Sequence, residues 1–103
     1  MVKENEKESP IDVADPFSRQ LVVQYLGRRK ADVDRLRQAL VAGDYDLIRV
    51  TGHNMSGSGA AYGFGQVSEV GAALERAAKA GDTAGIDGLI DRLNSLLTSI
   101  RLT

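Results

Sequence analysis

The sequence predicts an all-α protein: an up-down antiparallel four-helix bundle that follows a flexible N-terminal leader. Apolar residues recur at helical spacing in four separate segments. Short connectors rich in glycine and aspartate separate these segments, and no segment shows the alternation of apolar and polar residues typical of a strand. Because short connectors make successive helices antiparallel neighbours, an up-down bundle is the simplest way to pack four amphipathic helices.

The leader is expected to span residues 1–14, and the helical domain residues 15–103. Acidic residues and lysines dominate the leader, and few of its side chains could bury apolar surface. Such a segment cannot offset the conformational entropy that is lost on ordering. We therefore expect the leader to be flexible and the rest of the chain to form one small domain.

The first helix is expected to begin at Asp15-Pro16. An aspartate can cap the helix, and proline suits its first position because φ is already fixed at a helical value. Gly27 is a point at which this helix could break or bend. The pair Gly43-Asp44 then combines a helix stop with the cap of the next helix. The apolar stripe of the first helix consists of Phe17, Leu21, Tyr25, Leu26, Val33, Leu36 and Leu40.

The second helix is expected to start at Tyr45 and to end among the glycines near Gly63 and Gly65. Its buried stripe consists of Leu47, Ile48, Thr51 and Met55. The aromatic residues Tyr25, Tyr62 and Phe64 are expected to pack in the core or at an end of the bundle. The basic run of residues 28–30 is expected to form a solvated helix face.

Two further helices complete the predicted bundle. The third is indicated by Val67, Val70, Leu74, Ala77 and Ala78 and closed by Gly81. The fourth is capped by Asp82 or Thr83. It has the most regular pattern in the chain, and its apolar stripe consists of Ile86, Leu89, Ile90, Leu93, Leu96, Leu97 and Ile100.

Composition excludes several classes of function. The 103 residues carry a net charge of −1, contain no cysteine and include a single histidine. The near-zero charge argues against nucleic acid as a partner. The lack of thiols and of a second histidine argues against a metal site of the usual kinds, and no apolar run is long enough to span a membrane. We expect a cytoplasmic protein without a bound metal or cofactor.

The segment from Gly52 to Gly65 breaks the rules of helix formation, with five glycines in fourteen residues. Each glycine inside a helix costs about 0.8–1 kcal/mol relative to alanine. A phosphate-binding loop is a poor explanation, because no strand precedes the segment and no Gly-Lys-Ser sequence follows it. Close helix packing would explain those glycines that face inward, and clearance for a partner would explain those that face outward.

A helical wheel separates the two sides of this segment. At about 100° per residue, His53 lies about 160° from Met55, which belongs to the buried stripe, so the imidazole is expected to point to solvent. The same wheel places no carboxylate one turn from His53 on this face, which argues against hydrolysis. The neighbours of His53 on the outward face are Arg49, Ser56, Gly57 and Ala60. The ring therefore stands among small side chains.

These residues resemble the signature of the histidine-containing phosphotransfer (HPt) domain of bacterial two-component phosphorelays. The signature reads histidine, any residue, leucine or methionine, lysine, glycine, then serine or alanine, with a later glycine and a leucine-glutamate pair. The chain has His-Asn-Met-Ser-Gly-Ser at residues 53–58, Gly63 in the later glycine position and Leu74-Glu75 beyond it. The resemblance covers residues 15–102 and is specific in combination.

The resemblance implies that His53 is the phosphoacceptor and that Gly57 lets a receiver domain approach, with Gly52 and Ala60 on the docking surface. One position departs from the signature, because Ser56 stands where the family has a lysine. A cation that would sit beside the phosphoryl group is therefore missing. Arg49 could substitute for it, since a guanidinium contacts phosphate oxygens well.

The implied function is that of a phosphorelay intermediate rather than an enzyme. His53 would accept a phosphoryl group from an aspartate of a receiver domain, including that of a hybrid sensor histidine kinase, and pass it to another receiver. The receiver would supply most of the catalytic groups, and a monomer is expected. Two alternatives stay open: a degenerate HPt-like module that binds a receiver or kinase without phosphotransfer, and a generic bundle in which His53 is incidental.

Overall fold

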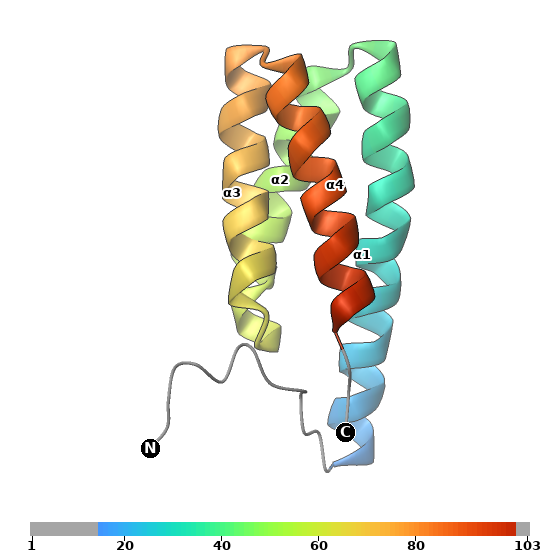
Figure 1. Ribbon diagram of the computed structural model, residues 1–103. Helices are drawn as coiled ribbons and strands as arrows, with labels where there is room; N and C mark the ends of the chain where they lie inside the picture. The colour runs from blue at the N-terminus through green and yellow to red at the C-terminus, as the bar shows by residue number, and fades with distance from the viewer. Residues whose placement is uncertain (1–14, 101–103) are drawn as a thin grey trace.

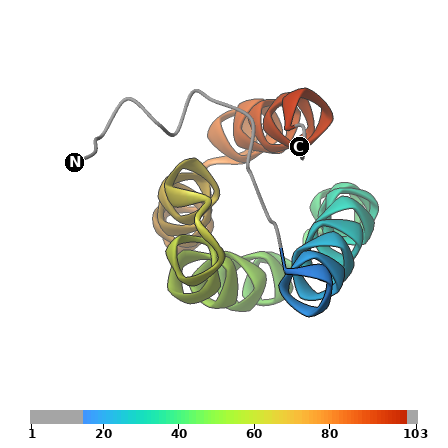
Figure 2. The ribbon, with the colours of Figure 1, turned by 90° about the horizontal axis from the view of Figure 1, so that it is seen from below.

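The computed structural model describes residues 15–100, which form a four-helix bundle (Figure 1). The helices are α1 (Pro16–Ala42), α2 (Tyr45–Ser58), α3 (Gly65–Ala80) and α4 (Thr83–Ser99), and one 3₁₀ turn, η2 (Ala60–Tyr62), joins α2 to α3. Seen end-on, the four helices enclose one core in chain order, with α1 beside both α2 and α4 (Figure 2). The predicted all-α fold is confirmed, and the predicted leader, residues 1–14, lies outside the described residues.

Three of the four helices, α1, α2 and α4, begin at an aspartate as expected. The carboxylates of Asp15, Asp44 and Asp82 each accept a hydrogen bond from the backbone N–H three residues later, at 3.0–3.1 Å. The fourth helix is therefore capped by Asp82, not by Thr83. Gly43 and Gly81 end α1 and α3 with φ of 71° and 65°, in the left-handed region that glycine adopts without a steric penalty. The Gly-Asp connectors thus turn the chain sharply at one end of the bundle.

One continuous core runs along the axis of the bundle. Its fully buried side chains come from all four helices, and the largest are Tyr25, Leu36, Ile48, Met55, Leu74, Ile86, Ile90 and Leu93. The predicted stripe of α4 divides into fully buried positions and partly buried ones at its edges. The stripe of α2 is buried at Ile48 and Met55, whereas Leu47 is only partly buried. This core fixes which face of each helix is left for function.

The first helix differs from its prediction in two ways. It runs without interruption through Gly27, which is exposed and has open space around it, because the buried residues on its inner face hold the helix on both sides. Its first turns also extend beyond the other helices (Figure 1). Phe17 is consequently 68% exposed, although it continues the apolar stripe.

The second and third helices approach each other at backbone contact distance through two glycines. A Cβ atom on Gly52 would lie 2.7 Å from the carbonyl oxygen of Gly71, and one on Gly71 would lie 2.6 Å from the backbone nitrogen of Ser56. Any side chain at either position would collide with backbone, which cannot move aside as a flexible side chain can. The close-packing explanation of the glycine-rich segment therefore holds for Gly52.

The end of α2 was predicted too far along the chain. The helix stops at Ser58, and Gly63, with a φ of 88°, ends the following 3₁₀ turn. Gly59 allows this change of direction, because a Cβ there would lie 2.6 Å from both the backbone nitrogen and the hydroxyl of Ser68. The hydroxyl of Ser68 accepts a hydrogen bond from the backbone N–H of Ala60 at 2.7 Å, which fixes the turn against α3.

We expect Gly57→Ala to stabilise the protein by about 0.5–1 kcal/mol, because Gly57 is helical and nothing lies within 4 Å of a Cβ built on it. Urea unfolding followed by circular dichroism measures this change. Gly59→Ala is the matched comparison and should destabilise the protein, since its Cβ would collide with Ser68. Stabilisation by both substitutions would show that the approach at Gly59 is not tight in solution.

Candidate functional site

His53 lies on the outer face of α2, as the helical wheel predicts. Its side chain is 69% exposed, whereas Met55, two residues further along, is 1% exposed and belongs to the core. The helix thus fixes the backbone of His53 through its buried side and leaves the imidazole accessible. An imidazole in this position can meet a reactive group carried by another protein.

A carboxylate from α3 contacts the imidazole. Glu75 Oε1 lies 3.3 Å from His53 Nδ1, although the two residues are 22 positions apart in the sequence. The close approach of the helices at Gly52 brings Glu75 here, because a Cβ on Gly52 would lie 2.8 Å from the backbone nitrogen of Glu75. As predicted, no carboxylate lies one turn from His53 on α2. The wheel of α2 could not indicate Glu75, because this residue belongs to another helix.

The contact with Glu75 decides which ring nitrogen is free. Hydrogen bonding from His53 lowers the pKa of Glu75 below its ordinary value, against the opposing effect of desolvation, so the carboxylate is ionised at neutral pH. An ionised carboxylate only accepts hydrogen bonds, and therefore Nδ1 of a neutral ring must carry the proton. Nε2 is then left with its lone pair. Lys79 Nζ lies 3.5 Å from the other oxygen of Glu75.

Arg49 and Ser56, the two residues expected beside the phosphoryl group, differ in their contacts. Arg49, one turn before His53, donates to Oδ1 of Asp46 from Nη2 at 2.8 Å and from Nε at 3.3 Å, so its guanidinium turns toward the start of α2. Ser56 is half-buried beside α3, where its backbone nitrogen meets Gly71. The two positions flank His53 along the helix.

Of the three positions expected to dock a partner, two are exposed and one is not. Gly57 and Ala60 are exposed, and nothing lies within 4 Å of a Cβ on Gly57. Gly52 is buried in the contact with α3, so the expectation that it belongs to the docking surface was wrong. The angular separation of about 100° from His53 turns Gly52 toward α3.

A family model described as the Hpt domain matches residues 20–103. The chain belongs to this family. No curated protein and no solved structure gives a significant match. In residues 15–100 of this Hpt domain, no helix is long and apolar enough to cross a membrane, and His, Cys, Asp and Glu side chains form no group of three that could hold a metal ion.

Aromatic packing anchors the end of α2 in the Hpt domain. The buried ring of Tyr25 stacks on Tyr62, with ring centroids 4.3 Å apart, and on Phe64 at 6.2 Å. The hydroxyl of Tyr25 lies 2.9 Å from the hydroxyl of Ser58, within hydrogen-bond distance. The expected core role of these three aromatic residues is confirmed, and their packing fixes the helix five residues beyond His53 to α1.

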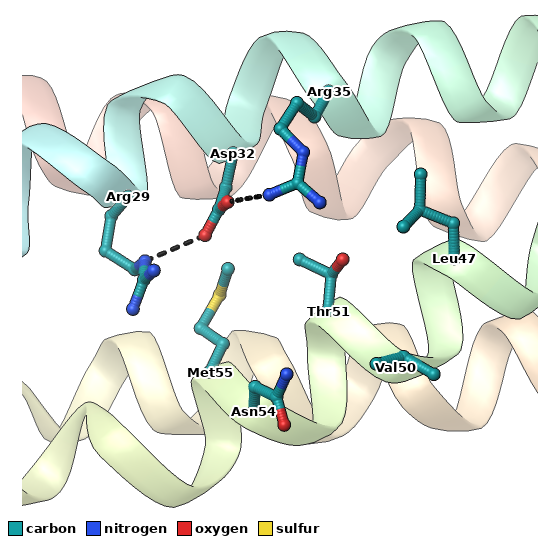
Figure 3. Close-up of a pocket in the computed structure, with 8 residues that line it drawn as sticks. All are labelled: Arg29, Asp32, Arg35, Leu47, Val50, Thr51, Asn54 and Met55. Carbon is teal, nitrogen blue, oxygen red and sulfur yellow. Dashed lines mark hydrogen bonds and ion pairs between the residues drawn. The ribbon is translucent and has the colours of Figure 1, made fainter.

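A small pocket lies between α1 and α2 of the Hpt domain, on the side of α2 that faces α1 rather than α3 (Figure 3). In it Asp32, a buried carboxylate, pairs with Arg29 at 2.8 Å and Arg35 at 3.0 Å. The guanidinium of Arg29 also lies 4.6 Å from the centre of the Tyr25 ring. Arg29 was expected on a solvated face, but these contacts make it a half-buried structural residue.

Proposed function

We propose that this Hpt domain is a phosphorelay intermediate in which Nε2 of His53 is the phosphoacceptor. The single observation that carries the proposal is the arrangement of the ring: it is 69% exposed, its Nδ1 faces an ionised carboxylate, and its other nitrogen is free. Members of the family carry phosphoryl groups rather than act as enzymes by themselves. The role assigned to His53 is our inference.

The proposed transfer is an in-line displacement at phosphorus. The lone pair of His53 Nε2 attacks the phosphorus of an aspartyl phosphate on a receiver domain, an N–P bond forms, and the P–O bond to the aspartate breaks with its electron pair left on the carboxylate oxygen. The proton on Nδ1 stays in place, and Glu75 stabilises the positive charge that develops on the ring. Because phosphoryl transfer depends mainly on alignment and charge, a presented imidazole can serve, and the reverse step passes the group to a second receiver.

The partner proposed for this surface is a response-regulator receiver domain, including one within a hybrid sensor kinase. Gly57 and Ala60 are exposed beside His53 and carry no large side chain. A receiver could therefore bring its aspartate to the ring without a steric clash at these two positions. Family members interact with receiver domains in phosphorelays. The proposal also keeps the monomeric state and the cytoplasmic location that the sequence analysis expects.

Phosphate transfer from receivers tests the proposal directly. The protein is incubated with receiver domains phosphorylated by a small-molecule donor, and any label is tested for stability in base and lability in acid and located by mass spectrometry. We expect label on residue 53. Receiver binding without label would contradict the proposal and favour the degenerate module, for which the neutral Ser56 is the supporting observation.

We expect Glu75→Ala to lower the initial rate of phosphotransfer to His53 about fivefold. Its carboxylate holds Nδ1, and a hydrogen bond worth about 1 kcal/mol corresponds to that factor. Glu69→Ala, which removes an exposed carboxylate from the same helix, is the control and should leave the rate unchanged. Equal rates for wild type and Glu75→Ala would show that the carboxylate does not orient the ring during transfer.

A further inference from the structure

Phosphorylation of His53 would create an electrostatic problem at this site. The phosphoryl group would carry up to two negative charges and would be bonded to a ring whose Nδ1 already lies 3.3 Å from the ionised Glu75. The phosphoryl group on Nε2 and the carboxylate that faces Nδ1 would flank the same ring and repel each other. Position 56, one turn along the helix, is a serine and offers no positive charge. A cation from elsewhere is needed to balance the two anions.

The candidates for this cation are Arg49, one turn before His53 on α2, and Lys79 on α3. Arg49 is held by two hydrogen bonds to Asp46, which turn its guanidinium toward the start of α2. Lys79 instead binds Glu75, the same carboxylate that contacts His53. Its position four residues after Glu75 places both side chains on one face of α3. The connection from Lys79 through Glu75 to His53 is thus already present.

We propose that Lys79 is the counter-cation of phosphorylated His53 and that Glu75 positions it there from α3. This inference rests on the proposed function of His53. The side chain of Lys79 is 60% exposed and flexible, and the 3.5 Å contact of its ammonium group with Glu75 is long, so the ammonium can move toward phosphate oxygens while staying beside the carboxylate. The positive charge that Ser56 does not provide then comes from a different helix.

The phosphoryl group itself can report a nearby cation. A nearby positive charge favours the form of the phosphohistidine with one proton fewer, so that losing the charge moves the titration midpoint of the phosphohistidine to higher pH. The 103-residue chain is phosphorylated with phosphoramidate, a small-molecule donor, and the phosphorus NMR signal of the phosphohistidine is followed between pH 6 and 9. We expect Lys79→Gln to raise the midpoint by about half a pH unit, as for a charge pair near the surface.

Three further variants make this measurement specific. Arg76→Gln removes one positive charge from the residue next to Glu75 on the same helix and should move the midpoint much less. Lys79→Arg should behave like the wild type, because it keeps the charge. Adding Ser56→Lys to Lys79→Gln should restore the wild-type midpoint, since the cation would return from α2. A midpoint that moves equally in Lys79→Gln and Arg76→Gln would overturn the inference.

The positioning role of Glu75 has its own readout in the unphosphorylated protein. Lys79 contributes to the lowered pKa of Glu75, although less than the hydrogen bond from His53 does. Carbon-13 NMR of the Glu75 carboxyl should therefore show its pKa rising toward the ordinary value in Lys79→Gln, and no change would contradict the positioning role.

If the Lys79→Gln midpoint moves as expected but no receiver exchanges phosphate with His53, the proposed function fails while the electrostatic inference stands. If receivers do exchange phosphate and the midpoint stays fixed, the inference alone fails.

Discussion

His53→Gln is expected to abolish the base-stable phosphate label completely, because the amide of glutamine has no nucleophilic lone pair comparable with that of imidazole. The chain contains no second histidine that could take over the role. The measurement is transfer of radioactive phosphate from a phosphorylated receiver, followed by separation of the two proteins. Label of wild-type amount on the variant would refute the assignment of His53.

The fold of His53→Gln should stay intact, which makes the loss of label interpretable. The ring is mostly exposed and contacts Glu75 at its rim, so we expect a change in unfolding free energy within about 0.5 kcal/mol. Asn54→Gln is the matched control, because it places a glutamine at the next exposed position of α2. In this variant His53 is retained and should accept phosphate at the wild-type rate. Receiver binding, measured by calorimetry, should survive both substitutions.

Gly71→Ala is expected to destabilise the protein by about 2–3 kcal/mol, a large part of the total stability of a small domain. The added Cβ would lie 2.6 Å from the backbone nitrogen of Ser56 and 2.7 Å from the carbonyl oxygen of Gly52, so α2 and α3 would have to separate. Urea unfolding measures the loss. Phosphotransfer should also slow, because separation would pull Glu75 away from His53.

Gly88→Ala is the control for this substitution. Gly88 lies in α4, and nothing is found within 4 Å of a Cβ built there, so alanine should stabilise the protein by about 0.5–1 kcal/mol through its helix propensity. Opposite signs for the two variants would separate the steric effect from the propensity effect. An unfolding free energy unchanged in Gly71→Ala would mean that the helices are further apart in solution.

The sequence was sufficient for features determined within one helix. The Gly-Asp connectors, the cap at Asp15 and the outward direction of His53 all follow from local chemistry or from helical period, and each is present in the structure. The helix end at Ser58 was missed because it depends on the approach of Gly59 to Ser68 on another helix. Local patterns carry no information about such contacts.

The candidate site shows the same division. His53 could be predicted from its surroundings, but its contact with Glu75 could not, because α2 and α3 must first be placed side by side. A signal was present in the Leu74-Glu75 pair, where a buried leucine precedes the glutamate. Gly52 was wrongly predicted to lie on the docking surface for a related reason. A helical wheel gives the angle between Gly52 and His53, but it does not show on which side of α2 the helix α3 lies.

The glycine contact between α2 and α3 has a consequence for how this protein can change partners. Since the backbones of these helices touch, we expect the pair to move as one body, so that His53 and Glu75 keep their spacing when a partner docks.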